Sequence, residues 1–408
     1  MVADVPNRVQ RGPGGIATCH VASQWRAVTR LLQALGGWCR ERGVAHLHLA
    51  LAGQVSSLLP WDAAAAQALV GTYPIWLDST CAPALPRLTA LWADGGDLKL
   101  LGTAMRPGTN WLATKLLHAG SMHGAAVWVQ VADAIFHRCT GVLRSHPSAQ
   151  ISLVDHGRQT YSAGMLEALG TDPDRLPPLD ASGQVRMLPT LAAAHGLPPT
   201  TVHVGLMDTA AALLGLGARP GDGLLLAGTS EIVGLWTAEA DPPPPSRLVR
   251  LPLGGGWAIY GSSASGGTTL DWLGRSVLGR SPAGLRRLRL AAAAIPPGAD
   301  GVTCRPWPDG ERAPLWDATL TAGFTGMRGH HGDAHLWRAM VEGVAYARRL
   351  TAEALERPLP GRFLAAGGGT ADPLANRIRA SVLGRPLVVY PHAEPALLGA
   401  MRHAAGVA

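Results

Sequence analysis

Apolar residues recur along this chain in stretches that have the periods of helices and strands. After Ser23, a possible N-cap, comes the stripe of an amphipathic helix at Trp25, Val28, Leu31, Leu32 and Leu35. Further helices are expected at 110–140, at 161–169, from Asp333, at 372–383 and from Glu394. Strands are expected at 45–51, 73–77, 255–261, 362–366 and 386–390, and two more flank a small-residue helix within 205–230. Residues 1–20 are turn-rich and unpatterned. Strands that alternate with helices favour an α/β fold.

Candidate chemistry is concentrated between Gly205 and Ser230. One short strand ends at a lone acid, Asp208, and a second apolar strand ends at the turn Gly228-Thr229-Ser230. A carboxylate in that position can accept the proton of an attacking hydroxyl, and backbone N–H groups of such a turn can hold phosphate oxygens. Asp208 could equally be a helix N-cap, and the second feature could be a plain turn.

Two more polar residues follow predicted strands. Gln54 comes after the strand 45–51, and Asp78 comes after the strand 73–77. In open α/β sheets, groups just beyond the strand ends line the crevice in which ligands bind. The alternative is that Gln54 and Asp78 only cap the elements that follow them.

Composition narrows the class of protein. The chain has 408 residues, of which 47% are apolar and 15% charged, so it has room for two domains with buried cores. Its net charge is +7, but the arginines are scattered, which argues against nucleic-acid binding. The five cysteines have no metal-ligand spacing, and no signal peptide or membrane-spanning apolar run is apparent, so a soluble cytoplasmic protein with no membrane partner is expected. The histidines, including His330 and His331, follow no metal spacing and are expected to be inert.

The motifs together resemble those of the FGGY carbohydrate kinases, and they occur in that family's order. They are Ala52-Gly53-Gln54, Trp76-Leu77-Asp78, Gly205-Leu206-Met207-Asp208, Gly215-Leu216-Gly217, Gly228-Thr229-Ser230, Gly267 with Trp272, Gly310-Glu311-Arg312-Ala313-Pro314, Arg338–Gly343, Gly367-Gly368-Gly369 with Leu383-Gly384, and Glu394 with Leu398-Gly399-Ala400. The matches span residues 45–405, and the closest likeness in style is to the xylulose kinases.

The resemblance implies two ribonuclease-H-like domains of the actin and hexokinase type, at 1–220 (sugar side) and 221–408 (nucleotide side), with a ligand cleft between them. It implies ATP-dependent phosphorylation of a sugar or polyol, with ATP and Mg²⁺ as cofactors, Asp208 as general base and a possible homodimer. The implied sugar-side residues are Gln54, Val55, Ser56, Asp78, Asp208 and Thr209. The implied nucleotide-side residues are Gly228, Thr229, Gly267, Asp271, Gly368 and Asp372. Asp271 could instead be a solvated acid, and Arg312 and Glu342 are expected to be structural.

The sequence departs from the family pattern in two ways. Residues 1–44 contain no Asp-x-Gly-Thr, the family's phosphate and metal loop, so either this chain lacks about one hairpin of its natural N-terminus or the protein has lost it. Val55-Ser56 and Thr209 also differ from the xylulose kinase pattern, so xylulose or a related ketose or polyol is only a first expectation. The alternative is a catalytically impaired relative that binds sugar or nucleotide without phosphoryl transfer.

Overall fold

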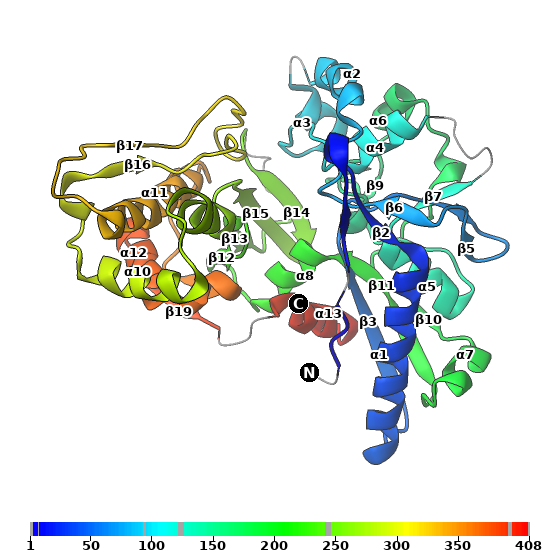
Figure 1. Cartoon of the computed structure of the whole chain (residues 1–408). Helices are drawn as coiled ribbons and strands as arrows, with labels where there is room; N and C mark the ends of the chain where they lie inside the picture. Colours follow the sequence, from blue (N-terminus) through cyan, green and yellow to red (C-terminus); the bar gives the residue numbers. More distant parts are fainter. Residues whose placement is uncertain are drawn as a thin grey trace. The chain divides into compact units, whose positions relative to one another are not determined.

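The computed structural model describes residues 3–6, 8–92, 95–120, 126–240, 246–390 and 394–406. Two compact units account for these residues (Figure 1). Unit 1 contains residues 1–102, 106–211 and 396–408, and unit 2 contains residues 103–105 and 212–395. The C-terminal segment therefore belongs to unit 1, although the sequence before it belongs to unit 2. No helix among the described residues is both long and apolar enough to cross a bilayer.

The main sheet of unit 1 has three strands in the order β10-β11-β3. The central strand β11 (Thr200–Met207) is parallel to β3 (Leu47–Gly53) and antiparallel to β10 (Gln184–Arg186). The sheet packs with α1 (Val21–Glu41) and α5 (Val131–Thr140) around a core that includes Leu32, Phe136, Cys139, Val202 and Val204. Within the described residues β3 is an edge strand of this sheet. The central strand β11 therefore ends next to a strand that is paired on one side only.

Smaller elements complete unit 1. Its short strands are β1 (Gln10–Arg11), β2 (Ala17–His20), β4 (Leu59–Asp62), β5 (Gln67–Ala68), β6 (Thr72–Pro74), β7 (Val127–Val129), β8 (Val154–Asp155) and β9 (Thr160–Tyr161). Its other helices are α2 (Leu85–Leu91), α3 (Gly96–Leu101), α4 (Leu112–Ala119), α6 (Ala163–Leu169), α7 (Pro189–Ala194) and α13 (Pro395–Ala404). These strands form the sheets β1-β2-β6 and β5-β4-β7 and the pair β8-β9.

Unit 2 is built on a six-stranded sheet in the order β14-β15-β13-β12-β18-β19. The strands are β12 (Gly223–Ala227), β13 (Glu231–Thr237), β14 (Val249–Leu253), β15 (Gly256–Ser262), β18 (Phe363–Ala366) and β19 (Leu387–Val389). The ladders among β14, β15, β13 and β12 are antiparallel, and β12, β18 and β19 are parallel. As a result the turn after β12 and the turn after β18 leave the same edge of the sheet.

Helices of unit 2 pack together beside this sheet (Figure 1). They are α9 (Gly267–Asp271), which continues as a π-helix (Trp272–Val277), α10 (Pro282–Ala294), α11 (Asp333–Glu353) and α12 (Pro373–Leu383). Their shared core includes Leu273, Leu285, Trp337, Met340 and Ile378. The hairpin β16 (Thr303–Arg305) and β17 (Gly323–Thr325) lies in the connection between α10 and α11.

Several local predictions differ from the structure. The helix expected at 110–140 is interrupted, because Val127-Trp128-Val129 form a strand that pairs with β4. Residues 10–20 contain the short strands β1 and β2, in which Ala17 and Cys19 are buried against β6. The first helix begins at Val21, so Ser23 is not its cap. Pro242–Pro245, expected to form a stiff loop, lie outside the described residues. The helices from Asp333, at 372–383 and from Glu394 are confirmed within two residues.

Candidate active site

Asp208 lies at the point where β11 ends, as the first residue of α8 (Asp208–Gly215). Oδ1 of Asp208 accepts hydrogen bonds from the Thr209 N–H at 2.6 Å and from the Thr209 hydroxyl at 3.3 Å. Burial raises the pKa of Asp208, and the hydrogen bonds from Thr209 oppose that rise. Because a carboxylate with a raised pKa is a stronger base, this environment suits proton abstraction from a hydroxyl.

The backbone that presents Asp208 is held by a buried polar chain. The Met207 N–H donates to Oγ of Ser148 at 3.1 Å, and Nδ1 of His146 accepts the Ser148 N–H at 3.0 Å. Both Ser148 and His146 are buried. The strand end is therefore fixed from the neighbouring 3-10 turn, Pro147–Gln150, as well as by its own sheet.

Gln54 lines a cavity of about 150 Å³ within unit 1. The cavity is lined by residues of α1, α5, β6, the end of β3 and the loop that follows it, among them Gln24, Gly53, Ser57, Tyr73 and Ala132. Ser57 donates its N–H to Oε1 of Gln130 at 2.8 Å, which fixes the loop that follows Gln54. Val55 lies in this loop and Ser56 is buried in it. Amide and hydroxyl groups at a partly apolar cavity are the groups that orient a small polyhydroxyl ligand.

The carboxylate of Asp78 is occupied by neighbouring groups. Oδ2 accepts the Ala17 N–H at 2.8 Å, and Oδ1 accepts the Thr80 N–H at 3.1 Å and the Thr80 hydroxyl at 2.5 Å. Asp78 is buried, and Nζ of the buried Lys115 donates to its backbone carbonyl at 2.8 Å. These contacts support a structural role that joins β2 to the turn after β6, and the sugar-contact role of Asp78 stays a prediction.

Three glycine-containing turns meet in unit 2. The turn Gly228-Thr229-Ser230 joins β12 to β13, and the Gly267 N–H donates to the Gly228 carbonyl at 3.0 Å. A Cβ at Gly267 would lie 2.7 Å from the Gly228 oxygen, so only glycine allows this approach. The third turn follows β18, where Gly367 has a φ of 98° and a Cβ there would lie 2.5 Å from the Ala227 oxygen.

The remaining nucleotide-side candidates lie on or after these turns. Gly228, Thr229 and Gly368 are exposed, and a Cβ at Gly368 would meet no atom within 4 Å. Asp372 caps α12, since its Oδ1 accepts the Leu374 N–H at 2.9 Å. Asp271 forms an exposed ion pair with Arg275 at 2.6 Å. The turns thus leave backbone groups accessible, whereas both acids are already engaged.

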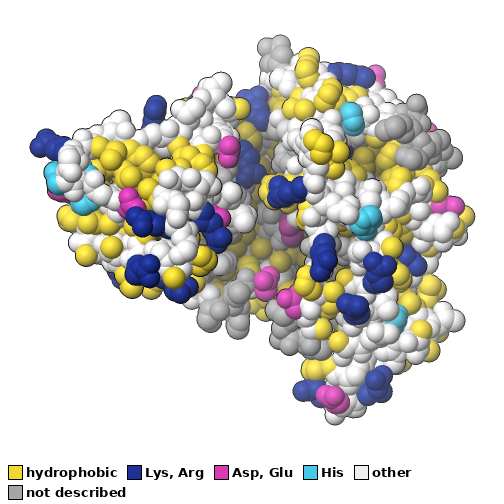
Figure 2. Space-filling model, viewed as in Figure 1, with side chains coloured by type: hydrophobic (Ala, Val, Ile, Leu, Met, Phe, Trp, Pro, Cys, Tyr) yellow, Lys and Arg dark blue, Asp and Glu magenta, His cyan; other side chains and the backbone are white. Residues whose placement is uncertain are grey.

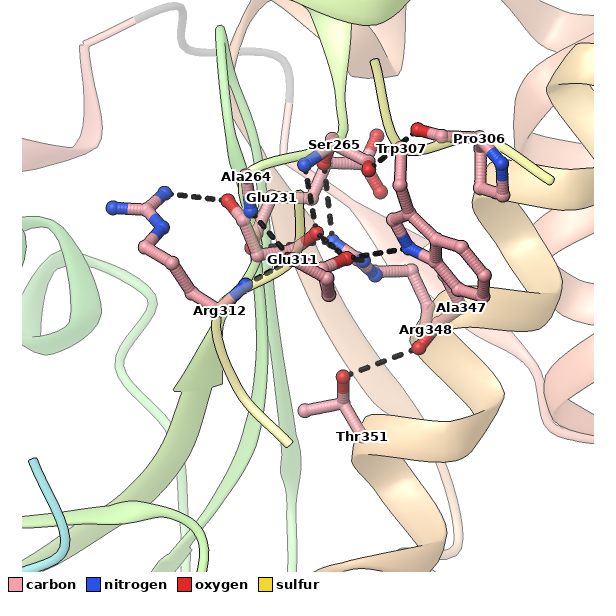
Figure 3. A network of polar contacts seen from close by, with 11 residues as sticks. Glu231, Ala264, Ser265, Pro306, Trp307, Glu311, Arg312, Ala347, Arg348 and Thr351 are labelled. Carbon is pink, nitrogen blue, oxygen red and sulfur yellow. Dashed lines mark hydrogen bonds and ion pairs between the residues drawn. The ribbon is translucent and has the colours of Figure 1, made fainter. Parts of the chain in front are cut away.

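Beneath the turns lies a buried network of two acids and two arginines, which we call the Glu-Arg network: Glu231, Glu311, Arg348 and Arg379. Oε2 of Glu311 accepts the Ser263 hydroxyl at 2.7 Å. Figure 3 shows Glu311 at the centre of the network, where its oxygens also accept the Ala264 N–H at 2.7 Å and the Trp307 Nε1–H at 3.0 Å. Arg348 bonds Glu311 at 3.3 Å and also donates to the backbone carbonyls of Glu231 and Ser265.

Arg379 links two of the turns. It is ion-paired with Glu231, the residue after Ser230, and it donates to the Gly369 carbonyl at 3.1 Å. It also donates to Oδ1 of Asn376 at 3.1 Å, and Asn376 in turn donates to the Thr370 carbonyl at 2.7 Å. The turn after β12 and the turn after β18 are therefore held by one buried side chain from α12.

The sequence reasoning missed the Glu-Arg network as a functional feature. Glu311 is part of the motif Gly310–Pro314, to which the sequence assigned no role. Glu231 directly follows Gly228-Thr229-Ser230, and that position next to a proposed phosphate turn could have indicated its importance. Nothing in the sequence near Arg348 or Arg379 indicated their role, because the acids they pair with, Glu311 and Glu231, lie 37 and 148 positions away. Arg312 donates to the Ser263 carbonyl, and Glu342 pairs with Arg338 at 2.6 Å, as expected for structural residues.

Comparison with known proteins agrees with this architecture. The model of the FGGY family of carbohydrate kinases, C-terminal domain, matches residues 223–408. The chain is 31% identical over 342 residues to the xylulose kinase of Klebsiella pneumoniae, which covers 79% of this chain and 67% of that enzyme. It is 26% identical over 290 residues to the xylulose kinase of Bacillus subtilis, which covers 69% of this chain and 58% of that enzyme. The chain belongs to the FGGY family of carbohydrate kinases.

Solved structures confirm the expected α/β fold. The xylulose kinase from Rhodospirillum rubrum matches with a TM-score of 0.84 and 26% identity, over 98% of this chain and 84% of that one. The glycerol kinase of Plasmodium falciparum, determined with ADP, matches with a TM-score of 0.83 and 16% identity, over 99% of this chain and 83% of that one. The fold is thus the two-domain actin and hexokinase type that the motifs implied.

Proposed function

We propose that this protein phosphorylates a hydroxyl group of a sugar at the expense of ATP, with xylulose or a related ketose or polyol as substrate. The observation that carries the proposal is Asp208, a carboxylate with a raised pKa at the C-terminal end of β11 in a chain of the FGGY family. The 31% identity to a xylulose kinase supports the choice of sugar class. Residues 1–220 would provide the sugar side and residues 221–408 the nucleotide side.

Each group has a distinct role in this proposal. Asp208 takes the proton of the attacking hydroxyl, and Thr209 orients the Asp208 carboxylate through its N–H and hydroxyl. Gln54 and the loop with Val55 and Ser56 bind the hydroxyl groups of the sugar. Thr229 offers its backbone N–H and hydroxyl to the phosphates, and Gly228 and Gly267 hold that turn in place through their own hydrogen bonds. The turn at Gly368 with Asp372 receives the nucleoside.

The nucleotide turns offer poor ligands for a protein-held Mg²⁺. Glu231 is buried and paired with Arg379, and Asp271 is paired with Arg275. Mg²⁺ needs oxygen ligands that are not already neutralised. The ion therefore enters this proposal only as part of the MgATP substrate, in which it is carried by the phosphates.

A second candidate function is binding of sugar or nucleotide without phosphoryl transfer. It is favoured by the engagement of acids near the glycine turns, since Asp271 is paired with Arg275 and Glu231 with Arg379, and a paired carboxylate is a poor ligand for the metal ion that phosphoryl transfer uses. A homodimer is compatible with either function and stays a prediction.

A coupled ADP-release assay on the full chain, with a panel of pentuloses, hexuloses and polyols, tests the proposal. We expect turnover with at least one ketose, and ADP release that depends on the sugar. Titration with a fluorescent ATP analogue is run in parallel. Nucleotide binding without sugar-dependent ADP release would favour the second function, and the absence of both binding and turnover would contradict both.

A further inference from the structure

Three side chains of types that commonly bind metal ions lie close together in unit 2, in loops other than the glycine turns. Asp300 lies in a 3-10 turn (Ala299–Gly301) after α10, and His330 and His331 lie in the loop that precedes α11. Nε2 of His330 is 3.1 Å from Oδ2 of Asp300, and Nε2 of His331 is 3.5 Å from the same oxygen. One ligand atom from each residue lies within 4.8 Å of the others. Figure 2 shows histidine side chains at the surface of this unit.

The two nitrogen-to-oxygen separations are close to those in the ligand shell of a tetrahedral ion. Bonds of about 2.0–2.1 Å to nitrogen and about 2.0–2.2 Å to oxygen place neighbouring ligand atoms of a tetrahedral Zn²⁺ about 3.3–3.4 Å apart. The two observed N–O distances, 3.1 and 3.5 Å, lie on either side of that value. An ion could therefore take the place of the hydrogen bond between His330 and the Asp300 carboxylate, while Nε2 of His331 exchanges its bond to the Asp300 carbonyl for the ion.

The loops that carry the three residues are already fixed next to each other. The β16–β17 ladder pairs Thr303 with Thr325, which brings residue 300 close to the loop after β17. A Cβ at Gly326 would lie only 2.2 Å from the Gly301 oxygen, so the two loop backbones are in direct contact. On the other side, the Gly298 N–H donates to Glu342 of α11 at 3.1 Å. Preformed loops lower the entropy that metal binding must overcome.

His331 is the most constrained of the three ligands. Its side chain is 1% exposed, and its Nδ1 accepts the Arg328 N–H at 2.9 Å. In the neutral ring the proton is therefore on Nε2, which donates to the Asp300 carbonyl at 3.2 Å. A metal ion at Nε2 requires the neutral ring to carry its proton on Nδ1, so the bond from the Arg328 N–H and the bond to the Asp300 carbonyl are both given up.

We propose that Asp300, His330 and His331 form a binding site for one divalent transition-metal ion of the Zn²⁺ and Co²⁺ class. His330 and His331 bind through Nε2, Asp300 binds through Oδ2, and water completes the shell. Two imidazoles and one carboxylate favour such ions over Mg²⁺ and Ca²⁺, which prefer all-oxygen sites. The ion would cross-link the loop after α10 to the loop before α11, a role independent of phosphoryl transfer.

The test uses the full chain without an affinity tag, freed of metal with EDTA and then titrated with Co²⁺ and with Zn²⁺. We expect about one equivalent of Co²⁺ to bind with the visible absorption of a tetrahedral site, and Zn²⁺ to displace it. His330→Ala removes a ligand that is 59% exposed, so the fold is preserved, and it should weaken Co²⁺ binding at least about 10-fold. Asp300→Asn keeps a side chain that tolerates the φ of 55° and should have the same effect.

His335→Gln is the matched control. Its ring lies 4.9 Å from that of His331, but His335 is not one of the three ligands, so Co²⁺ binding should persist. The site would be refuted if the wild-type chain gave no tetrahedral Co²⁺ spectrum, or if the His330→Ala and Asp300→Asn variants bound Co²⁺ as tightly as the wild type. Loss of binding in His335→Gln equal to that in His330→Ala would also refute this ligand set.

Discussion

At Asp208 the environment opposes the charge that the proposed chemistry needs. Burial raises the pKa of this carboxyl, and the bonds from Thr209 only partly compensate. An acid with a raised folded-state pKa binds a proton more tightly in the folded than in the unfolded chain. Its contribution to stability is therefore present at low pH and is lost as the pH rises through the folded-state pKa. A base that lowers the stability of the fold when it is charged is typical of catalytic positions.

Asp208→Asn should abolish sugar-dependent ADP release and leave the unfolding temperature at neutral pH unchanged or raised. The amide cannot accept the hydroxyl proton, but it removes the partly buried charge. Turnover by the coupled assay and thermal unfolding by circular dichroism measure the two effects. Asp174→Asn, at an exposed acid of unit 1, is the matched control and should change neither. Turnover at the wild-type rate in Asp208→Asn would rule out the base assignment.

At the scale of elements, the proposed nucleotide side of unit 2 depends on how closely its glycine-containing turns approach each other. Gly267 contacts the Gly228 carbonyl, Gly266 lies against Ser230 and Gly367 lies against Ala227. The Glu-Arg network then supports the turns, since Arg379 pairs with Glu231 and donates to the Gly369 carbonyl. Accessible backbone groups on a buried ionic support form a rigid surface that needs little rearrangement to bind an anion.

Gly267→Ala should weaken nucleotide binding at least about 10-fold, because the new methyl group would lie 2.7 Å from the Gly228 oxygen and push the two turns apart. Titration with a fluorescent ATP analogue measures the change. Gly361→Ala is the control, since a Cβ at that position meets no atom within 4 Å. Equal affinities of Gly267→Ala and the wild type would show that the close contact of the turns is not needed for binding.

Arg379→Leu should destabilise the protein by about 3–5 kcal/mol, because it leaves Glu231 buried without its partner. Urea unfolding followed by circular dichroism gives the free energy of unfolding. Adding Glu231→Gln should recover part of the loss, since the uncompensated charge is removed.

Arg377→Leu, two residues away on the exposed face of α12, is the control for Arg379→Leu and should change the free energy of unfolding by less than about 0.5 kcal/mol. If Arg379→Leu were as mild as Arg377→Leu, the pair with Glu231 would not hold the turns together.

At the scale of the whole molecule, the chain returns to unit 1 at its end. Helix α13 belongs to unit 1, and the ring of His403 lies 5.5 Å from that of His146 in an edge-on arrangement. Burial, with a further contribution from His403, lowers the pKa of His146 to about 3. Burial also lowers the pKa of His403 and of His203. Unit 1 therefore contains three histidines, His146, His203 and His403, that favour the neutral form in the folded chain.

The protein should lose about 2 kcal/mol of stability between pH 7 and pH 5 through His146. In that range the unfolded chain, with a histidine pKa of 6.5, binds a proton that the folded chain excludes. Urea unfolding at the two pH values measures the loss, which should be smaller in His146→Gln. His118→Gln, at an exposed histidine, should lose as much as the wild type. An equal loss in His146→Gln and wild type would assign the acid sensitivity to other groups.

The expected absence of nucleic-acid binding concerns the whole surface. On the face shown in Figure 2, Lys and Arg side chains are spread over both units and do not gather in one patch. The absence of nucleic-acid binding stays a prediction from the scattered arginines of the sequence.

Local pattern was sufficient where an element has a strong periodicity or a glycine-rich boundary. The helices from Asp333 and at 372–383, the position of Asp208 at a strand end and the order of the glycine turns were all readable in this way. Pattern failed at 127–129, where a short apolar strand sits between two helices and has no periodicity of its own. It also failed at β1 and β2, which are strands because β6 pairs with β2.

The sequence by itself determined the α/β class, the family and the residues that can carry chemistry, because these depend on short motifs and their order. Only the tertiary structure decided how those residues are engaged. It placed Asp78 in a hydrogen bond with the Ala17 N–H, 61 positions away, and paired Glu231 with Arg379 across 148 positions of sequence. It also brought Asp300 to His330 and His331. Such contacts are set by strand pairing and helix packing between distant segments, which leave no local pattern in the chain.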